Sequence, residues 1–241
     1  MNANALESRL RILEGRVAEL ETELTAKDKR LRDLEDIEAI KKLQCAYGYY
    51  LEHWMAEEIV DCFSTSPEVS ATFVEGTYHG QEGIRRYFRP GSRQPPTFLH
   101  MVLQVSPVIT LDPDGVHARG RWYGYGNILA RYTQPLDPAY MAVTYEMDYV
   151  RENGVWKILV LRLLMHFAYS YGLGKVPEGM AQPDRRPPAL NPDEWAPHEF
   201  GYPSGYIYPM HFVHPVTGRA TTENERNAKL ELGPNRFKPK E

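Results

Sequence analysis

The chain has 241 residues, of which 42% are hydrophobic and 25% charged, as in a folded protein with one domain and appendages. Its net charge of −4 gives no indication of a nucleic-acid partner. No apolar run reaches membrane-spanning length, and no signal segment is visible. We interpret the two cysteines, Cys45 and Cys62, as small core residues of a protein in the reducing cytoplasm.

Residues 1–35 carry a heptad repeat with one polar interruption, Lys27. Acidic residues follow the d positions, and Arg9, Arg16 and Arg30 precede a positions, a charge pattern that pairs parallel helices across a coiled coil. We therefore predict a homo-oligomer, with folding of the stripe onto the chain's own domain as the alternative. The apolar seam consists of Leu6, Leu10, Leu13, Val17, Leu20, Leu24, Leu31 and Leu34.

Residues 36–167 contain predicted helices followed by predicted strands. A second apolar helical face begins at Asp36 and continues past a junction at Glu52 and His53. A break is expected at Pro107, and the sequence DPDG at 112–115 is a strong turn signal. The expected elements are a strand at 69–73, a helix at 81–88, and strands at 98–111, 116–127, 140–151 and 155–167. This order predicts an α+β fold, a cone in which a curved antiparallel sheet over helices leaves a cavity for a small ligand.

Residues 168–241 change character, because prolines recur and no helical or strand periodicity persists. The segment 201–212 is nevertheless too aromatic for a free tail. We interpret 168–241 as an ordered arm that packs on this chain or on a neighbouring subunit. Its HxxH-like cluster (His198, Glu199, His211 and His214) is weak support for zinc, and we predict no metal site and no cofactor.

Four pieces of the chain resemble the nuclear transport factor 2-like superfamily, in its SnoaL-like branch. They are residues 47–63, 76–88, 99–100 and 148–162. Together with the order of the predicted elements, they extend the resemblance over about residues 36–166. The resemblance implies a conical α+β barrel. It leaves function open, because the same cone hosts dehydratases, isomerases, cyclases, lyases and pure binding proteins.

Within this superfamily, the scytalone dehydratase family allows a comparison of individual residues. Glu52 falls where that family has a pocket Asp, His100 where it has a pocket His, and Tyr78 near a substrate-holding tyrosine. Gly120 stands where the second pocket His would be, which argues against simple dehydration. The resemblance favours a trimer over a dimer. The aromatic arm also resembles a bacterial group that acts on lignin-derived aromatic dimers without a cofactor and releases formaldehyde.

These observations predict a cofactor-independent lyase for a small aromatic, phenolic substrate, with loss of water or retro-aldol loss of formaldehyde. A His and a carboxylate facing each other across an apolar cavity would each be poised to move protons near pH 7. An isomerase acting next to a ketone, or a ligand-binding module without turnover, are the alternatives. We expect catalysis from Glu52, His100 and Tyr78, and substrate binding by Tyr47, Tyr50, Arg121, Tyr123 and Arg162.

Overall fold

The computed structural model describes residues 3–92, 94, 98–129, 138–170, 174–175, 188–195 and 210–220. The chain divides into two compact units, Met1–Ala39 and Ile40–Glu241. One helix, α1, runs from Ala3 to Glu52 and belongs to both. Asp36 therefore changes the apolar face without starting a new helix, because this 50-residue stretch contains no proline. No helix in the described part of the chain is long and apolar enough to cross a membrane.

The last three turns of α1 show why one side of this helix is core. Ile40, Gln44 and Tyr47 share a face at helical spacing, and all three side chains are fully buried. The opposite side contains Cys45, which is exposed. The prediction of a buried Cys45 is therefore wrong, whereas Cys62 is buried as predicted.

Two short helices follow α1. They are α2 (Ala56–Asp61) and α3 (Gly80–Phe88), and α3 packs on α2 and on the short strands β1 (Ser70–Thr72) and β2 (Gly76–His79). The junction between α1 and α2 contains Trp54 in a left-handed conformation with φ of 55°. The Trp54 indole Nε1 donates to the carbonyl of Phe88 over 2.7 Å, which ties the junction to the end of α3.

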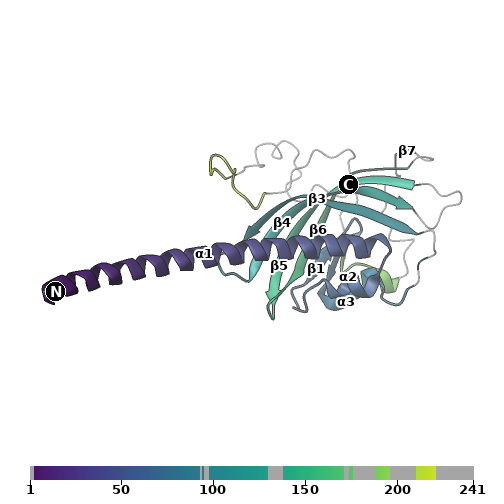
Figure 1. The fold of residues 1–241 in the computed structure, drawn as a ribbon. Helices are drawn as coiled ribbons and strands as arrows, with labels where there is room; N and C mark the ends of the chain where they lie inside the picture. Colours follow the sequence, from purple (N-terminus) through teal and green to yellow (C-terminus); the bar gives the residue numbers. More distant parts are fainter. Residues whose placement is uncertain are drawn as a thin grey trace. The chain divides into compact units, whose positions relative to one another are not determined.

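The long strands β3–β6 form a mostly antiparallel sheet (Figure 1), and the α+β prediction is confirmed. The sheet order is β3-β4-β5-β6-β1-β2-β8, with β7 paired to β6. The predicted break at Pro107 is confirmed, since the β3–β4 register shifts between Val105 and Val108. The bounds are β1 Ser70–Thr72, β2 Gly76–His79, β3 Leu99–Leu111, β4 His117–Leu129, β5 Pro138–Glu152, β6 Val155–Ser170, β7 Gly174–Lys175 and β8 Glu194–Trp195.

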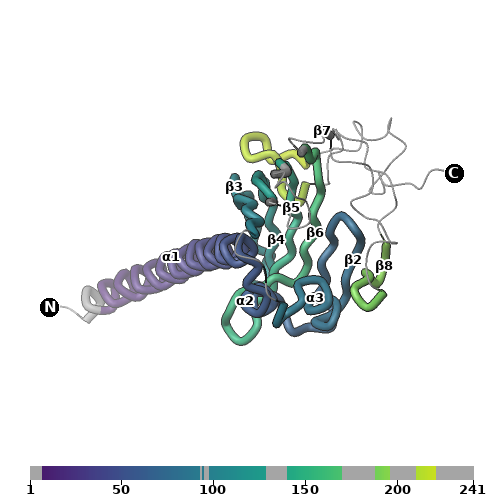
Figure 2. Tube along the Cα trace, turned by 90° about the vertical axis from the view of Figure 1, so that its right-hand side faces the viewer, coloured from purple at the N-terminus to yellow at the C-terminus, as the bar shows by residue number. Residues whose placement is uncertain are grey.

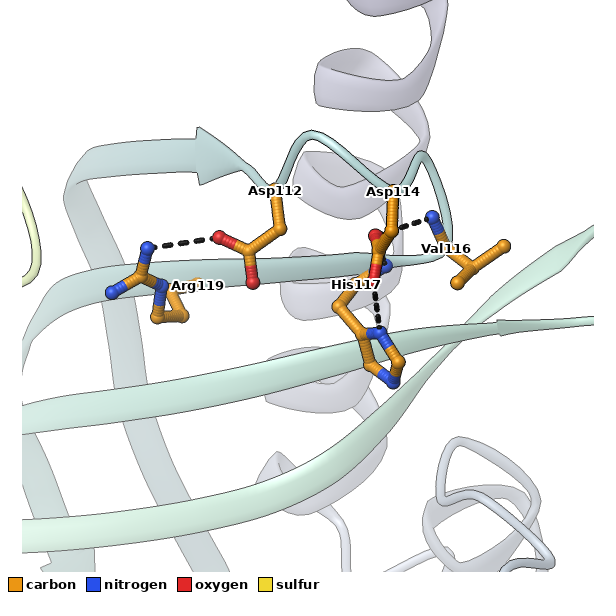
Figure 3. A network of polar contacts seen from close by, with 5 residues as sticks. All are labelled: Asp112, Asp114, Val116, His117 and Arg119. Atoms are coloured by element: carbon orange, nitrogen blue, oxygen red, sulfur yellow. Dashed lines mark hydrogen bonds and ion pairs between the residues drawn. The ribbon is translucent and has the colours of Figure 1, made fainter.

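The turn between β3 and β4 is held by its own carboxylates (Figure 3). Asp114 accepts hydrogen bonds from the backbone N–H groups of Val116 and His117, and its second oxygen lies 2.6 Å from His117 Nδ1. These bonds, led by the one to His117, lower the pKa of Asp114 to about 2. Asp112 pairs with Arg119 over 2.8 Å. The predicted DPDG turn is thus confirmed.

The two faces of the sheet differ in polarity. On one face Trp122, Tyr145 and Tyr149 are almost completely buried, and we call it the inner face. Alternation places Arg121 and Glu146, which are cross-strand neighbours, on the opposite or outer face. The inner face contacts Gln44 of α1, so it is the side that the helix covers.

The described parts of the arm pack on this chain's own sheet. β8 pairs with β2 (Figure 2), and a side chain at Gly76 would overlap the backbone of Glu194. Asp193 pairs with Arg86 over 2.5 Å. The 3₁₀ turn Pro188–Leu190 precedes this contact. Most of 201–212 lies outside the described residues, and so does the charged end of the chain.

Candidate functional site

Tyr47 is the buried tyrosine at the centre of the candidate site. Its ring packs edge-on against Phe63 and Phe88, with ring centroids 6.1 and 6.4 Å away. Its hydroxyl is buried and has no hydrogen-bond partner among the described residues. Burial, with smaller contributions from Tyr145 and Tyr87, raises the pKa of Tyr47 well above its ordinary value. The residue is therefore a neutral phenol with an unused donor and acceptor, which a ligand oxygen would satisfy.

A chain of neutral hydrogen bonds lies on the inner face close to Tyr47. Trp122 Nε1 donates to the Tyr149 hydroxyl over 2.9 Å, and that hydroxyl donates to Gln44 Oε1 over 2.8 Å. Gln44 Nε2 then donates to Gln104 Oε1 over 2.9 Å. Gln104 Nε2 in turn donates to the carbonyl of Val102 over 3.0 Å. This series of hydrogen bonds fixes the orientation of the two inner-face amides and of the Tyr149 hydroxyl.

Tyr145 is a second neutral phenol on this face. Burial raises its pKa to about 12, opposed by a hydrogen bond with Gln104. Its ring lies against Gly124, where an added Cβ would come within 2.6 Å of the ring edge. Together with Tyr47 and the Gln104 amide, it gives the inner face a set of uncharged hydrogen-bonding groups.

His100 lies at the start of β3, on the same face as Val102 and Gln104 by alternation. Its ring contacts Trp54 and Phe98, with centroids 5.6 and 6.4 Å away. Burial among these rings lowers its pKa to about 4. The expectation that a carboxylate holds this pKa near 7 is therefore wrong. His100 is neutral at pH 7 and is able to accept a proton from a ligand.

The structure does not bring Glu52 into contact with His100. Glu52 is the last residue of α1, and its Oε1 lies 3.7 Å from Nε2 of the neighbouring His53. Within the described residues no hydrogen bond or ion pair joins Glu52 to His100. Trp54, two residues further on, contacts His100 instead. The chain reversal at Trp54 thus places an indole where the sequence predicts a carboxylate.

Tyr78 and Tyr50 serve packing in this structure. Tyr78 is fully buried, and its hydroxyl donates to the carbonyl of Leu190 over 3.3 Å. Its ring lies 5.1 Å from that of Tyr87, with the Arg86 guanidinium 5.7 Å from its centroid. Tyr50 is half-buried against the core. Tyr78 therefore anchors the arm.

Three predicted binding residues lie on the outer face instead of the inner one. Arg121 forms an ion pair with the buried Glu146, and Arg162 pairs with Asp148 over 2.7 Å. Tyr123, two residues after Arg121 on the same strand, is 57% exposed. The sheet therefore separates all three from Tyr47 and His100. A bulge-free stretch of β4 fixes this alternation, which the sequence alone left open.

The histidines of the arm do not form a metal site in the described structure. His211 Nδ1 lies 3.7 Å from Glu146 on the outer face, and His214 accepts backbone N–H bonds within its own turn. His198 and Glu199 lie outside the described residues. Among the residues that are described, no group of three or more His, Cys, Asp or Glu is placed to hold a metal ion.

Gly120 has a steric explanation. A Cβ at this position would lie 2.9 Å from the Tyr149 ring and 3.0 Å from Trp122 Nε1. Those two side chains share the hydrogen bond that begins the inner-face chain. A second pocket histidine therefore has no room here, since Tyr149 and Trp122 occupy its place.

Sequence reasoning missed the amides of this site. Gln44, Gln104, Tyr149 and Trp122 were not among the predicted site residues. One signal was available: Gln44 stands between Ile40 and Tyr47 on the apolar face of α1, and a polar residue on a buried face needs a buried partner. Nothing in the sequence identifies that partner as Gln104.

Comparisons with known proteins agree with this geometry. The model of the SnoaL-like domain matches residues 32–162, more than half of the chain. The chain belongs to the SnoaL-like domain family. Its described part places a helix, two short helices and a curved sheet in the order that the resemblance implied.

Several solved structures are similar to this chain at low sequence identity. A putative scytalone dehydratase from Novosphingobium aromaticivorans is 17% identical, with a TM-score of 0.50 over 63% of this chain and 98% of that one. A type 2 hexachlorocyclohexane dehydrochlorinase (LinA) is 18% identical, with a TM-score of 0.49 over 63% of this chain and 99% of that one. An NTF2-like protein with a cystatin-like fold from N. aromaticivorans is 19% identical, with a TM-score of 0.44 over 59% of this chain and 89% of that one. The likeness to the first of these structures, at 17% identity and a TM-score of 0.50, shows the fold alone.

Proposed function

We propose that this SnoaL-like protein is a cytoplasmic, cofactor-independent lyase that acts on a small phenolic, lignin-derived aromatic compound. The observation that supports it best is the buried Tyr47 hydroxyl, which has no partner among the described residues. A buried phenol costs free energy when it is unpaired, and an oxygen atom of a bound ligand would remove that cost. The aromatic rings around it, Phe63, Phe88 and Tyr87, suit an aromatic ligand.

The proposed reaction uses these neutral groups. The ligand's phenol oxygen accepts a hydrogen bond from Tyr47, which stabilises negative charge there as the phenol proton passes to His100. His100 then gives that proton to the benzylic hydroxyl, which departs as water, and a quinone methide forms. His100, neutral again, removes the proton of an adjacent hydroxymethyl group. The carbon–carbon bond breaks, formaldehyde leaves, and the electron pair restores the aromatic ring, whose oxygen regains a proton from His100.

The test is incubation of the purified chain with phenolic dimers that have a hydroxymethyl group next to a benzylic alcohol. Trapped formaldehyde and the aromatic product are measured by mass spectrometry. The matched substrate has its phenol methylated, and we expect no product from it. Tyr47→Phe and His100→Gln should each lower kcat about 100-fold or more, whereas Tyr49→Phe, exposed on the same helix, should not. Equal turnover by Tyr47→Phe would overturn the assignment.

A binding module without turnover is the second candidate. It is favoured by one observation: within the described residues no carboxylate contacts His100, so a paired acid and base are absent in this conformation. Thermal-shift binding of phenolic dimers without product would support this candidate. Product formation with any dimer would exclude it.

A further inference from the structure

The first half of α1 presents an apolar stripe that the described chain leaves exposed. Seven seam residues, Leu10, Leu13, Val17, Leu20, Leu24, Leu31 and Leu34, are each between 47% and 59% exposed. They recur with alternating spacings of three and four, apart from Lys27. A row of this length on one helix is costly when it is exposed, because it keeps a continuous apolar surface in contact with water. We therefore expect another apolar surface to cover this stripe.

The charges beside the stripe favour the same stripe on a second copy of the chain as that covering surface. The a positions are 10, 17, 24 and 31, and the d positions are 13, 20, 27 and 34. Glu14, Glu21 and Glu35 then occupy e positions, and Arg9 and Arg30 occupy g positions. A surface with acid along one edge and base along the other is complementary to a second copy of itself.

The same charges decide the orientation. In a parallel, in-register pair each g residue faces the e residue five positions on in the other helix. Arg9 then meets Glu14 of the second copy, and Arg30 meets Glu35. In an antiparallel pair, acids would face acids and arginines would face arginines. Glu23 facing Asp28 is the single unfavourable pairing in the parallel arrangement.

These charged groups are available for the contact. In the described part of the chain, Arg9, Arg30, Glu14, Glu21 and Glu35 form no ion pair. Arg16 pairs with Glu19 in its own helix over 2.9 Å, but both side chains are more than half exposed. Such a surface pair contributes little and is readily exchanged.

We propose that residues 6–34 of α1 form a parallel, in-register coiled coil with a further copy of this chain. Lys27 is the discordant layer, since its ammonium groups meet at a d position. It weakens the assembly. At the same time it favours the in-register alignment, because only that alignment confines the lysines to a single layer of the seam. The proposal does not depend on the catalytic assignment.

The experiment measures the mass of the full-length chain by light scattering over a dilution series. We expect an oligomer whose dissociation constant rises at least about 100-fold in Leu20→Glu. Lys27→Leu should lower it more than about 10-fold. Thr22→Glu, at an exposed f position, is the matched control and should leave it unchanged. Circular dichroism shows whether each variant stays folded.

Orientation is tested by oxidation of Leu13→Cys in a Cys45→Ser background. A d-position cysteine meets its own copy in a parallel, in-register pair, so a cross-linked product is expected. A monomeric parent chain would overturn the proposal. So would an oligomer that Leu20→Glu leaves intact, or one in which the Leu13→Cys variant fails to cross-link.

Discussion

Replacement of Tyr47 by phenylalanine should make the free protein more stable. The change removes one hydroxyl that is buried without a partner and keeps the ring contacts with Phe63 and Phe88. A buried, unsatisfied hydroxyl costs about 1–3 kcal/mol, and that cost disappears in the variant. For a chain of this size the gain corresponds to a rise in Tm of about 2–12 °C.

Urea unfolding of the ligand-free protein, followed by tryptophan fluorescence, measures the effect. Tyr49→Phe provides the control, because Tyr49 is 71% exposed on the same helix and its loss should stay within about 0.5 kcal/mol. A loss of stability in Tyr47→Phe would refute the reasoning, since it would show that the hydroxyl has a partner in the folded chain. A gain in stability together with lost turnover is the signature of a group retained for function.

Three further predictions concern the sheet. Since the pKa of His100 is about 4 when folded and 6.5 when unfolded, the parent should lose up to about 3 kcal/mol relative to His100→Gln as pH falls from 6.5 to 4, by urea titration. Gly120→His should not restore a pocket histidine but should destabilise the fold by about 1–3 kcal/mol, through overlap with Tyr149. Glu146→Gln should cost about 3 kcal/mol, because it removes the buried carboxylate that pairs with Arg121.

Each of these has an outcome that contradicts it. A difference between parent and His100→Gln that stays constant from pH 7 to pH 4 would mean that the ring keeps its ordinary pKa. For Gly120→His the control is Gly15→Ala, in a helix where an added Cβ meets nothing within 4 Å, and it should not destabilise the fold. Unchanged stability in Glu146→Gln would show that the outer-face pair is screened by water.

Much of the fold is predictable because its signals are local. Pro107, the DPDG turn and the strand at 155–167 each depend on a few neighbouring residues, and the structure reproduces all three. The continuity of α1 through Asp36 was harder to foresee. The heptad seam and the core face meet there without any residue that breaks a helix, so only the change of face is visible in the sequence.

The site is less predictable because its contacts are distant in sequence. Gln44 meets Gln104 across 60 positions and Tyr149 across 105. The inward or outward direction of Arg121 depends on register, which a single bulge reverses. The resemblance placed Glu52 in the site, but the left-handed turn at Trp54 brings the indole to His100 in place of the carboxylate.

The sheet separates charge from neutral polarity, and this separation restricts the ligand. Arg121, Arg162, Glu146 and Asp148 lie on the outer face and pair with one another. The described inner face of β3–β6 presents amides, phenols and a neutral imidazole, since burial keeps Tyr145 and Tyr149 protonated and His100 unprotonated. A carboxylate ligand would lose its hydration there and find no cation among these groups. A neutral phenol would find a donor, an acceptor and aromatic walls, and its charge would develop only as the reaction proceeds, where a fixed hydroxyl lowers the barrier most.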